Sequence, residues 1–355
     1  MSLPFEVPGP AYRTRQVERW VYRSFAATFD EMTDLPAATR AELSASIGSI
    51  RPQPEAIRTA DEGDTVKALF LGGFETVAMR YEGGRRTVCV SSQAGCGLGC
   101  TFCATGQMGL IRNLEPFEIV AQVLWAGETF GGERPTNVVF MGMGEPLANY
   151  DAVLAAIRSI HEDVGISARR IVVSTVGLVP QMERLAGEDL PLTLALSLHA
   201  PDDATRTPLV PINERWPVAR VLAAAKEFRR SHGRRVSIEY ALIAGTNDRD
   251  DQADALARLL KGSDIHVNLI PLNPTPGFGV PASTRVEEFE ARLRRGGVNA
   301  TVRDTRGREI DAACGQLATE LAVPQRAKPR GAKPRGAKPR AGTPSRGRRS
   351  SASGA

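Results

Sequence analysis

The spacing of apolar and polar residues predicts that the chain begins with a small helical module. Between residues 11 and 48, apolar residues recur at helical intervals, among them Trp20, Val21, Phe25 and Leu43. These positions can pack together only if the segment folds as short helices around a core of its own. We therefore expect an N-terminal helical domain ahead of the main fold.

A different pattern, of short apolar runs, begins at residue 65. Val66–Phe70 and Glu75–Met79, separated by Gly72 and Gly73, predict a β extension. Strand and helix patterns then alternate, which indicates an α/β fold with a parallel sheet and helical crossovers. The expected strands are Thr87–Ser91, Asn137–Met141, Arg170–Ser174, Thr193–Leu198, Val236–Ala241, His266–Ile270 and Asn299–Arg303, and the helices between them include Pro116–Glu128, Val218–Arg230 and Asp250–Leu260.

Three cysteines, Cys96, Cys100 and Cys103, stand in a C-x3-C-x2-C array inside a glycine-rich loop. Iron–sulfur clusters are normally completed by four thiolates. Three thiolates can hold a four-iron cluster and leave one iron open to a small molecule with an amine and a carboxylate, such as S-adenosylmethionine. There are two alternatives. One is a structural zinc site, which usually has four ligands in paired units, and the other is three ordinary buried cysteines.

Polar residues follow several of the expected strands. Gly144 and Glu145 come after the second parallel strand, Ser174 ends the third, Ser197, Leu198 and His199 end the fourth, and Asn273 lies just past the sixth. In barrels of parallel strands the chemistry lies at the carboxyl ends of the strands. These residues are therefore expected to meet at one mouth.

Composition predicts a soluble, globular, cytoplasmic protein. The 355 residues include no signal peptide and no apolar stretch long enough to cross a bilayer, and five cysteines without disulfide-like spacing suit a reducing compartment. The net charge of +5 is uneven, because residues 326–349 contain ten Lys or Arg and no acid. This repetitive basic tail is expected to be disordered.

Four motifs together resemble the RlmN/Cfr family of radical S-adenosylmethionine RNA methyltransferases. They are the cysteine array with the preceding segment from Cys89, the loop Gly142–Leu147, the run Ser197–Ala200, and Asp311–Leu317 around Cys314. The resemblance covers about residues 10–320 and implies an α/β, partial (β/α)6 radical SAM barrel with an N-terminal helical accessory domain and a disordered basic C-terminal tail. The implied boundaries are 1–60 for the helical domain, 61–86 for the β extension, 87–322 for the barrel and 323–355 for the tail.

The resemblance also implies roles for the remaining cysteines. An adenine ring carbon is not nucleophilic, so a polar methyl transfer to it would fail and a radical route is required. By resemblance, Cys314 takes a methyl group from one S-adenosylmethionine, and a second is cleaved at the [4Fe-4S] cluster, so two are used per turnover. Cys89 would release the product by forming a disulfide with Cys314, and Glu75 would act as the base for the ring proton. The alternative for Cys89 and Cys314 is that they are buried and pack as small apolar residues. The alternative for Glu75 is that it is a surface carboxylate.

Ligand and partner roles follow from the same resemblance. Gly144 and Glu145 would bind the amine end of S-adenosylmethionine, and Ser174, Ser197, Leu198, His199 and Asn273 would contact its other groups, with Cys96, Cys100 and Cys103 as metal ligands. The implied partners are 23S rRNA, tRNA, an electron donor such as flavodoxin or ferredoxin, and a thiol reductant, with no membrane.

The position of methylation stays open within the resemblance. The loop at Gly144–Pro146 and the segment Leu269–Pro274 look like the branch that methylates adenine carbon 2 in 23S rRNA and in tRNA beside the anticodon, whereas Pro211–Arg215 is found more readily in the carbon-8 branch that confers antibiotic resistance. Two other classes of protein remain as alternatives: a radical enzyme with a non-RNA substrate, and a non-catalytic RNA-binding protein with a structural cluster.

Basic residues could supply the contacts to RNA. Arg15, Arg19 and Arg23 recur every four residues on one helical face, which fits either a solvated face or contact with an RNA backbone. The tail could act as an RNA tether or be a dispensable extension. Further candidates for phosphate contacts are Arg85, Arg86, Arg229, Arg230, Arg234 and Arg235.

Overall fold

The structure is a computed structural model that describes residues 3–275, 277–317 and 354. The helices are α1 (Ala11–Tyr22), α2 (Ala37–Ile47), α3 (Ala104–Met108), α4 (Pro116–Thr129), α5 (Tyr150–Glu162), α6 (Val179–Leu185), α7 (Asp203–Leu209), α8 (Val218–His232), α9 (Asp250–Leu260) and α10 (Val286–Arg295). The strands are β1 (Pro54–Ala60), β2 (Thr65–Phe70), β3 (Phe74–Arg80), β4 (Arg86–Cys89), β5 (Gln93–Cys96), β6 (Gly109–Asn113), β7 (Asn137–Phe140), β8 (Ile171–Thr175), β9 (Thr193–Ser197), β10 (Val236–Leu242), β11 (His266–Pro271) and β12 (Ala300–Val302). The predicted disordered tail falls outside the described residues, Gly354 excepted.

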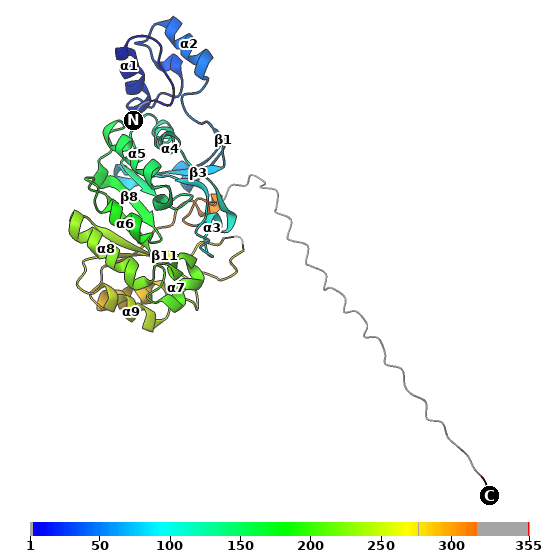
Figure 1. The fold of residues 1–355 in the computed structure, drawn as a ribbon, viewed down its shortest axis with the longest axis vertical. Coiled ribbons are helices and arrows are strands. Elements are labelled where there is room, and N and C mark those ends of the chain that lie inside the picture. The colour runs from blue at the N-terminus through cyan, green and yellow to red at the C-terminus, as the bar shows by residue number, and fades with distance from the viewer. Residues whose placement is uncertain (1–2, 276, 318–353, 355) are drawn as a thin grey trace. The chain divides into compact units, whose positions relative to one another are not determined.

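Ten of the strands form one sheet, in the order β1-β2-β3-β4-β7-β8-β9-β10-β11-β12. From β4 to β12 every neighbouring pair is parallel, whereas β1, β2 and β3 are joined as antiparallel neighbours at one end. Within the described residues no pairing joins β12 to β1, so the sheet stays open (Figure 1). The predicted α/β partial barrel is confirmed, with the three-residue β12 as a seventh parallel strand.

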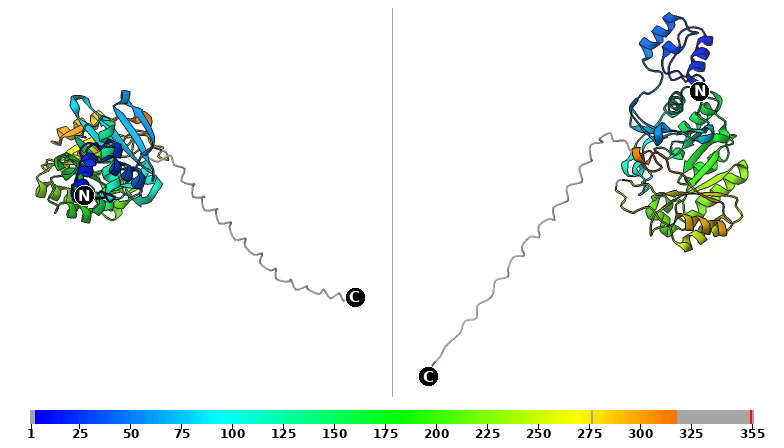
Figure 2. Two further views of the ribbon diagram at one scale, coloured as in Figure 1. Left: turned by 90° about the horizontal axis from the view of Figure 1, so that it is seen from above. Right: turned by 180° about the vertical axis from the view of Figure 1, so that it is seen from behind.

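Helices between the parallel strands cover the outer face of the sheet, as the views from above and behind also show (Figure 2). The core between these layers is built from strand residues with no exposed surface, such as Val138, Ile171 and Leu194, and from α4 and α5. Burial of these side chains is the main favourable contribution to folding. Within the described residues, no helix is both long enough and apolar enough to span a membrane.

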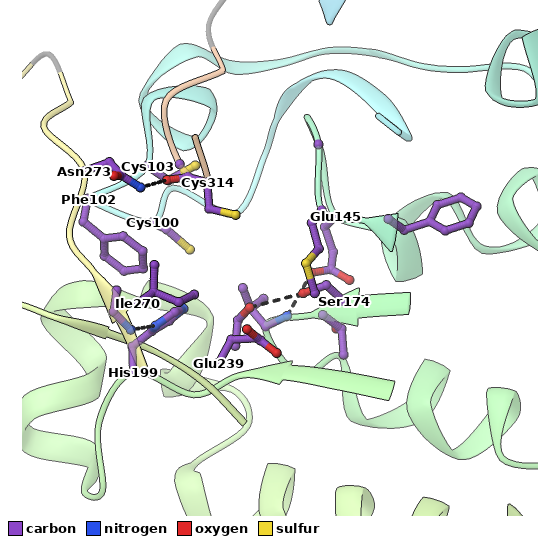
Figure 3. Close-up of a pocket in the computed structure, with 18 of the residues that line it drawn as sticks. Cys100, Phe102, Cys103, Glu145, Ser174, His199, Glu239, Ile270, Asn273 and Cys314 are labelled. Carbon is purple, nitrogen blue, oxygen red and sulfur yellow. Dashed lines mark hydrogen bonds between the residues drawn. The ribbon is translucent and has the colours of Figure 1, made fainter. Parts of the chain in front are cut away.

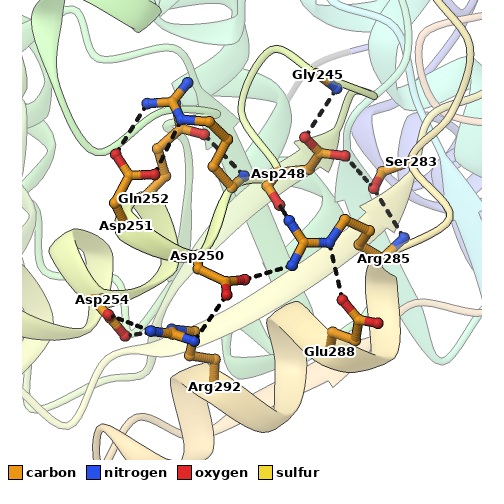
Figure 4. Close-up of polar contacts among 11 residues, drawn as sticks. Gly245, Asp248, Asp250, Asp251, Gln252, Asp254, Ser283, Arg285, Glu288 and Arg292 are labelled. Atoms are coloured by element: carbon orange, nitrogen blue, oxygen red, sulfur yellow. Dashed lines mark hydrogen bonds and ion pairs between the residues drawn. The ribbon is translucent and has the colours of Figure 1, made fainter.

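A polar network fastens α10 to α9 and so supports β12, which follows α10 (Figure 4). Arg292 donates to both carboxylate oxygens of Asp254 at 2.7 and 2.8 Å and to Asp250 at 3.0 Å. Arg285, just before α10, donates to Asp250 and Glu288. Such exposed pairs contribute little one by one, but the shared carboxylate of Asp250 couples them into a network.

The N-terminal module is joined to the rest of its compact unit by arginines. Arg23 donates to the carbonyl oxygens of Glu162, at 2.7 Å, and Val164. Arg19 pairs with Asp34 inside the module. Of the predicted arginine stripe, Arg15 alone lacks a side-chain partner within the described residues, and all three arginines are exposed to solvent.

Residues 54–60, which the sequence places in the helical domain, form β1 and pair antiparallel with β2. Most of the β1 side chains are exposed, so the strand has no buried alternation that a sequence pattern could reveal. The domain boundaries at 60, 86 and 322 stay predictions.

Candidate functional site

An open pocket lies at the carboxyl ends of the parallel strands (Figure 3). Its cavity volume is about 160 Å³. Nine of the residues that the sequence singles out line it: Cys100, Cys103, Gly144, Glu145, Ser174, Ser197, His199, Asn273 and Cys314. Cys96, Cys89, Glu75 and Leu198 are not among the lining residues. The segments that meet here are separated by up to about 200 residues of sequence.

The three clustered cysteines occupy a loop between a short hairpin and α3. Cys96 ends β5, which pairs with β6, and Cys103 immediately precedes α3. Gly95 is required at the hairpin, because its φ is +72° and a Cβ there would lie 2.0 Å from the carbonyl oxygen of Gly109. Burial raises the pKa of the Cys96 thiol to about 12 and that of Cys100 well above its usual value. Ligation must therefore remove these protons, as metal binding to thiols generally does.

The three thiols of this loop are the candidate ligands of a metal centre. Within the described residues, no group of three or more His, Cys, Asp or Glu is already arranged to hold a metal ion. In a four-iron cluster each thiolate binds a different iron, so the sulfur atoms stand farther apart. After burial, the charges of Cys103 and Cys96 also contribute to the raised pKa of Cys100.

Gly144 and Glu145 form the wall of the pocket after β7. The Glu145 carboxylate accepts hydrogen bonds from the backbone N–H groups of Leu147 and Val176, both at 3.0 Å. Burial nevertheless raises its pKa to about 7. A cationic amine beside this carboxylate would favour its charged form. Gly144 has a φ of +94°, and a Cβ there would lie 2.5 Å from the Gln93 side chain.

The ends of β8 and β9 contribute hydroxyl and imidazole groups. Ser174 Oγ and Ser197 Oγ lie 3.4 Å apart. His199 Nδ1 accepts a hydrogen bond from the backbone N–H of Ala241 at 3.0 Å, which leaves the proton on Nε2. Burial lowers the pKa of His199 to about 3, so its ring is neutral and acts as a fixed donor.

Leu198, between these residues, is fully buried, and its backbone supports the site. Its carbonyl oxygen accepts a hydrogen bond from Arg206 Nε at 2.9 Å. Arg206 also donates to the carbonyl oxygens of Val176 and Ser197. Arg206 thus ties the ends of neighbouring strands together from inside the protein. The sequence analysis missed it, since nothing in the sequence distinguishes a buried arginine from a solvated one.

Cys314 reaches the pocket on a loop that the barrel holds at several points. Asn273 Nδ2 donates to the Cys314 carbonyl oxygen at 3.1 Å, and the backbone N–H of Ala104 donates to the Gly315 carbonyl oxygen at 2.8 Å. The buried Oδ1 of Asn273 has no hydrogen-bond partner among the described residues. Buried polar atoms are rarely left without a partner, so this oxygen is available to a ligand.

Cys89 ends β4 and interacts electrostatically with Cys314. Burial, with a smaller contribution from Cys314, raises the pKa of Cys89 to about 12. All five cysteines lie in described residues and are free thiols, so the disulfide implied between Cys89 and Cys314 is not formed here. Arg303, which the sequence analysis missed, lies 3.7 Å from the Glu239 carboxylate, and the charges of Cys314, Glu239 and Cys89 raise its pKa.

Glu75 is at the start of β3 and is connected to the Cys314 loop through Lys67. Lys67 Nζ lies 3.2 Å from Glu75 Oε1 and donates to the carbonyl oxygen of Asp311, also at 3.2 Å. Both side chains are almost fully buried. Lys67 was not singled out by sequence, because a lysine in a strand is usually solvent-exposed.

Two family models match parts of this chain. Residues 6–48 match the family model of the ribosomal RNA large subunit methyltransferase N-terminal domain, and residues 90–257 match that of the radical SAM superfamily. A probable dual-specificity RNA methyltransferase RlmN from Parafrankia sp. (strain EAN1pec) is 55% identical over 344 residues, which cover 90% of this chain and 89% of that protein. The relative with the same description from Thermobifida fusca (strain YX) is 54% identical, covering 86% and 88%.

A solved structure is similar over almost the same length. The crystal structure of a radical SAM methyltransferase from Sphaerobacter thermophilus superposes with a TM-score of 0.82 at 49% identity, covering 87% of this chain and 93% of that one. Identity at this level over most of both chains establishes the relationship. The chain belongs to the RlmN family of radical SAM RNA methyltransferases.

Proposed function

We propose that this enzyme methylates carbon 2 of adenosine in 23S rRNA and in tRNA beside the anticodon, with Cys314 carrying the methyl group as S-methylcysteine. The supporting observation is the position of Cys314. This thiol is more than 200 residues from the clustered cysteines in sequence, yet it lines the same pocket as Cys100 and Cys103. The relatives' description as dual-specificity RNA methyltransferases supports RNA as the substrate.

The cofactors of a radical SAM enzyme are a [4Fe-4S] cluster and S-adenosylmethionine. When bound, they supply the methyl group and the one-electron chemistry that an unreactive ring carbon requires. Cys96, Cys100 and Cys103 would hold the cluster. Two features of the chain fit the second cofactor: the buried Glu145 carboxylate, which lines the pocket, and the Asn273 Oδ1 atom, which has no hydrogen-bond partner among the described residues.

The remaining polar groups would orient the ligands rather than react. His199 would donate from Nε2, because its Nδ1 is occupied by the Ala241 N–H. The hydroxyls of Ser174 and Ser197 can each donate or accept. These groups come from the ends of adjacent parallel strands, so the sheet itself fixes the distances between them.

Two residues would handle protons and the release of product. Glu75 would accept the ring proton, with Lys67 holding its carboxylate next to the Cys314 loop. Cys89 would form a disulfide with Cys314 as the product leaves, and a cellular thiol reductant would restore both thiols. An electron donor such as flavodoxin or ferredoxin would supply the electron that reduces the cluster.

The test is the chemical identity of the product. RNA from cells that lack an enzyme of this family, with and without this chain, is digested, and methyladenosines are identified by mass spectrometry against synthetic standards. We expect 2-methyladenosine in both rRNA and tRNA with the wild-type chain and none with Cys314→Ala. A carbon-8 product would contradict the proposed position, and the absence of any methyladenosine would contradict the function.

A further inference from the structure

A second cavity lies beside Cys314 and is not used by the chemistry described above. Four residues line both this cavity and the main pocket: Ile270, Asn273, Arg303 and Cys314. Its other walls are Met79 and Tyr81 from the end of β3, the segment Asp304–Arg306 after β12, and Ala312–Ala313. The cavity therefore lies where the chain crosses from the β12 edge of the open sheet to the antiparallel strands.

The Tyr81 ring, which lines this cavity, is contacted by two arginines: Arg306, which also lines the cavity, and Arg85, which does not. The guanidinium carbon of Arg85 lies 3.8 Å from the centre of the Tyr81 ring, and that of Arg306 lies 4.8 Å from it. The backbone N–H of Tyr81 also donates to the Arg85 carbonyl oxygen at 2.9 Å. Gly83 and Gly84, with φ of +75° and +79°, make this tight turn possible. Arg85 is therefore held in place without a carboxylate.

Arg85 differs from most of the other basic candidates in having no carboxylate partner among the described residues; Arg235 shares this property but does not line the cavity or contact Tyr81. Arg86 pairs with Glu133, Arg229 with Asp264 and Arg230 with Glu227. Arg85 is exposed and has no carboxylate partner within the described residues. An exposed, preoriented guanidinium without a counter-ion is well suited to a phosphate group, because it loses little freedom when it binds.

A second observation within the cavity also indicates a polar ligand. The hydroxyl oxygen of Thr305 is buried and has no hydrogen-bond partner among the described residues. Arg306 is only loosely engaged, with Asp304 at 3.6 Å and Asp64 at 3.8 Å. A phosphodiester with its ribose would offer charge to the two arginines and hydrogen-bonding groups to Thr305.

We propose that the phosphodiester next to the target adenosine of the RNA substrate binds at the mouth of this cavity, where Arg85 stacks on Tyr81, with Arg85 as its principal cation and Tyr81 as the residue that positions Arg85. The inference rests on the proposed function, since it takes the base facing Cys314 to be the methylated adenosine. A base that enters the main pocket must leave its stack. The RNA backbone on either side of that base then has to run close to Cys314. The second cavity opens next to Cys314, where this backbone would run.

The first test is RNA binding by variants, measured by fluorescence anisotropy with a labelled tRNA transcript across a series of salt concentrations. Removal of one phosphate contact should weaken binding by roughly fivefold at low salt and reduce the slope of log affinity against log salt by about 0.7 to 1. We expect this result for Arg85→Gln. The matched control is Arg235→Gln, which removes another exposed arginine, placed before β10 and outside the cavity; it should bind as the wild type does.

Two substitutions of Tyr81 test its positioning role. Tyr81→Phe keeps the ring and loses only a 3.5 Å contact between the hydroxyl and Met79 Sδ, so it should bind RNA normally. Tyr81→Leu removes the platform for Arg85 and should weaken binding in the same direction as Arg85→Gln. Melting temperatures establish that each variant is folded.

The second test locates the contact on the RNA. A stem-loop substrate is prepared with an uncharged methylphosphonate on either side of the target adenosine. Wild-type protein should lose affinity for one of these substrates, whereas Arg85→Gln should show no further loss on the same one, as expected when the two changes remove one shared interaction.

The outcomes separate this inference from the proposed function. If wild-type protein forms methyladenosine but Arg85→Gln binds with unchanged affinity and salt slope, the inference is overturned and the function stands. Equal losses in Arg85→Gln and Arg235→Gln would also overturn it, because they would indicate a diffuse charge effect. If wild-type protein neither binds nor methylates RNA, the proposed function itself fails.

Discussion

The buried imidazole of His199 gives a direct test of the pocket, through substitution by asparagine. Asparagine suits this position, because the His199 φ of +59° is in the left-handed region that asparagine tolerates. Its Oδ1 can also take the place of Nδ1 as acceptor for the Ala241 N–H. The variant therefore removes the titrating group and retains the hydrogen bond.

The expected effect follows from the difference in pKa between the folded and unfolded states. Burial lowers the pKa of His199 from 6.5 to about 3, so the folded protein resists protonation that the unfolded chain accepts. The contribution of His199 to the free energy of unfolding is fully present above pH 6.5 and is lost as the pH falls towards 3. Between about pH 7.5 and about pH 5 the wild type should lose about 2 kcal/mol of unfolding free energy from His199 alone.

Denaturant unfolding of the cluster-free wild type and His199→Asn at these two pH values measures this quantity. The difference in unfolding free energy between the two proteins should change by about 2 kcal/mol in favour of the variant at the lower pH. Phe102→Leu is the control, because it removes the edge-to-face ring contact with His199, at 4.7 Å, and keeps the imidazole. If wild type and His199→Asn lose stability in parallel, His199 is not the buried neutral base that the structure shows.

Three further predictions concern other parts of the chain. Gly144→Ala should abolish S-adenosylmethionine binding in calorimetry, since its Cβ has no space at a φ of +94°, whereas Gly233→Ala, with open space at a φ of +59°, should cost only about 1 kcal/mol of stability and leave binding intact. Glu128→Gln should destabilise the protein by about 3 kcal/mol in thermal unfolding, because it leaves the buried guanidinium of Arg51 without its counter-charge, and Arg51→Met should cost less, because the Glu128 carboxylate left behind is half exposed. Deletion of residues 326–355 should weaken RNA binding and flatten its salt dependence; unchanged affinity at every salt concentration would argue against a tether.

Much of the site could be predicted because strand ends are visible in sequence. Ser174 and Asn273 follow apolar runs, and the parallel topology that these runs predict brings their ends to one edge of the sheet. The cysteine array is likewise local, since its three thiols lie within eight residues. Such features depend on short-range spacing and strand–helix alternation, which a single sequence records directly.

Charged residues inside the protein could not be predicted in this way. Arg206, Lys67 and Arg303 look like solvated side chains in sequence, yet each is held by groups from distant segments. Arg23 is exposed, as its stripe indicates, but its guanidinium also donates to the carbonyl oxygens of Glu162, at the end of α5, and of Val164, which the stripe does not reveal. Long charged side chains take their partners from tertiary packing, and no periodic pattern marks those partners.

The sequence by itself determined the parallel α/β fold, the cysteine loop and the set of polar groups at the strand ends, because each arises from the spacing of neighbouring residues. Only the tertiary structure decided that Cys314 meets Cys100 across the pocket, that His199 is neutral with its proton on Nε2, and that Arg85 is left without a counter-ion at a second cavity. These properties depend on which distant segments pack together, since burial and hydrogen-bond partners set the charge and orientation of each group.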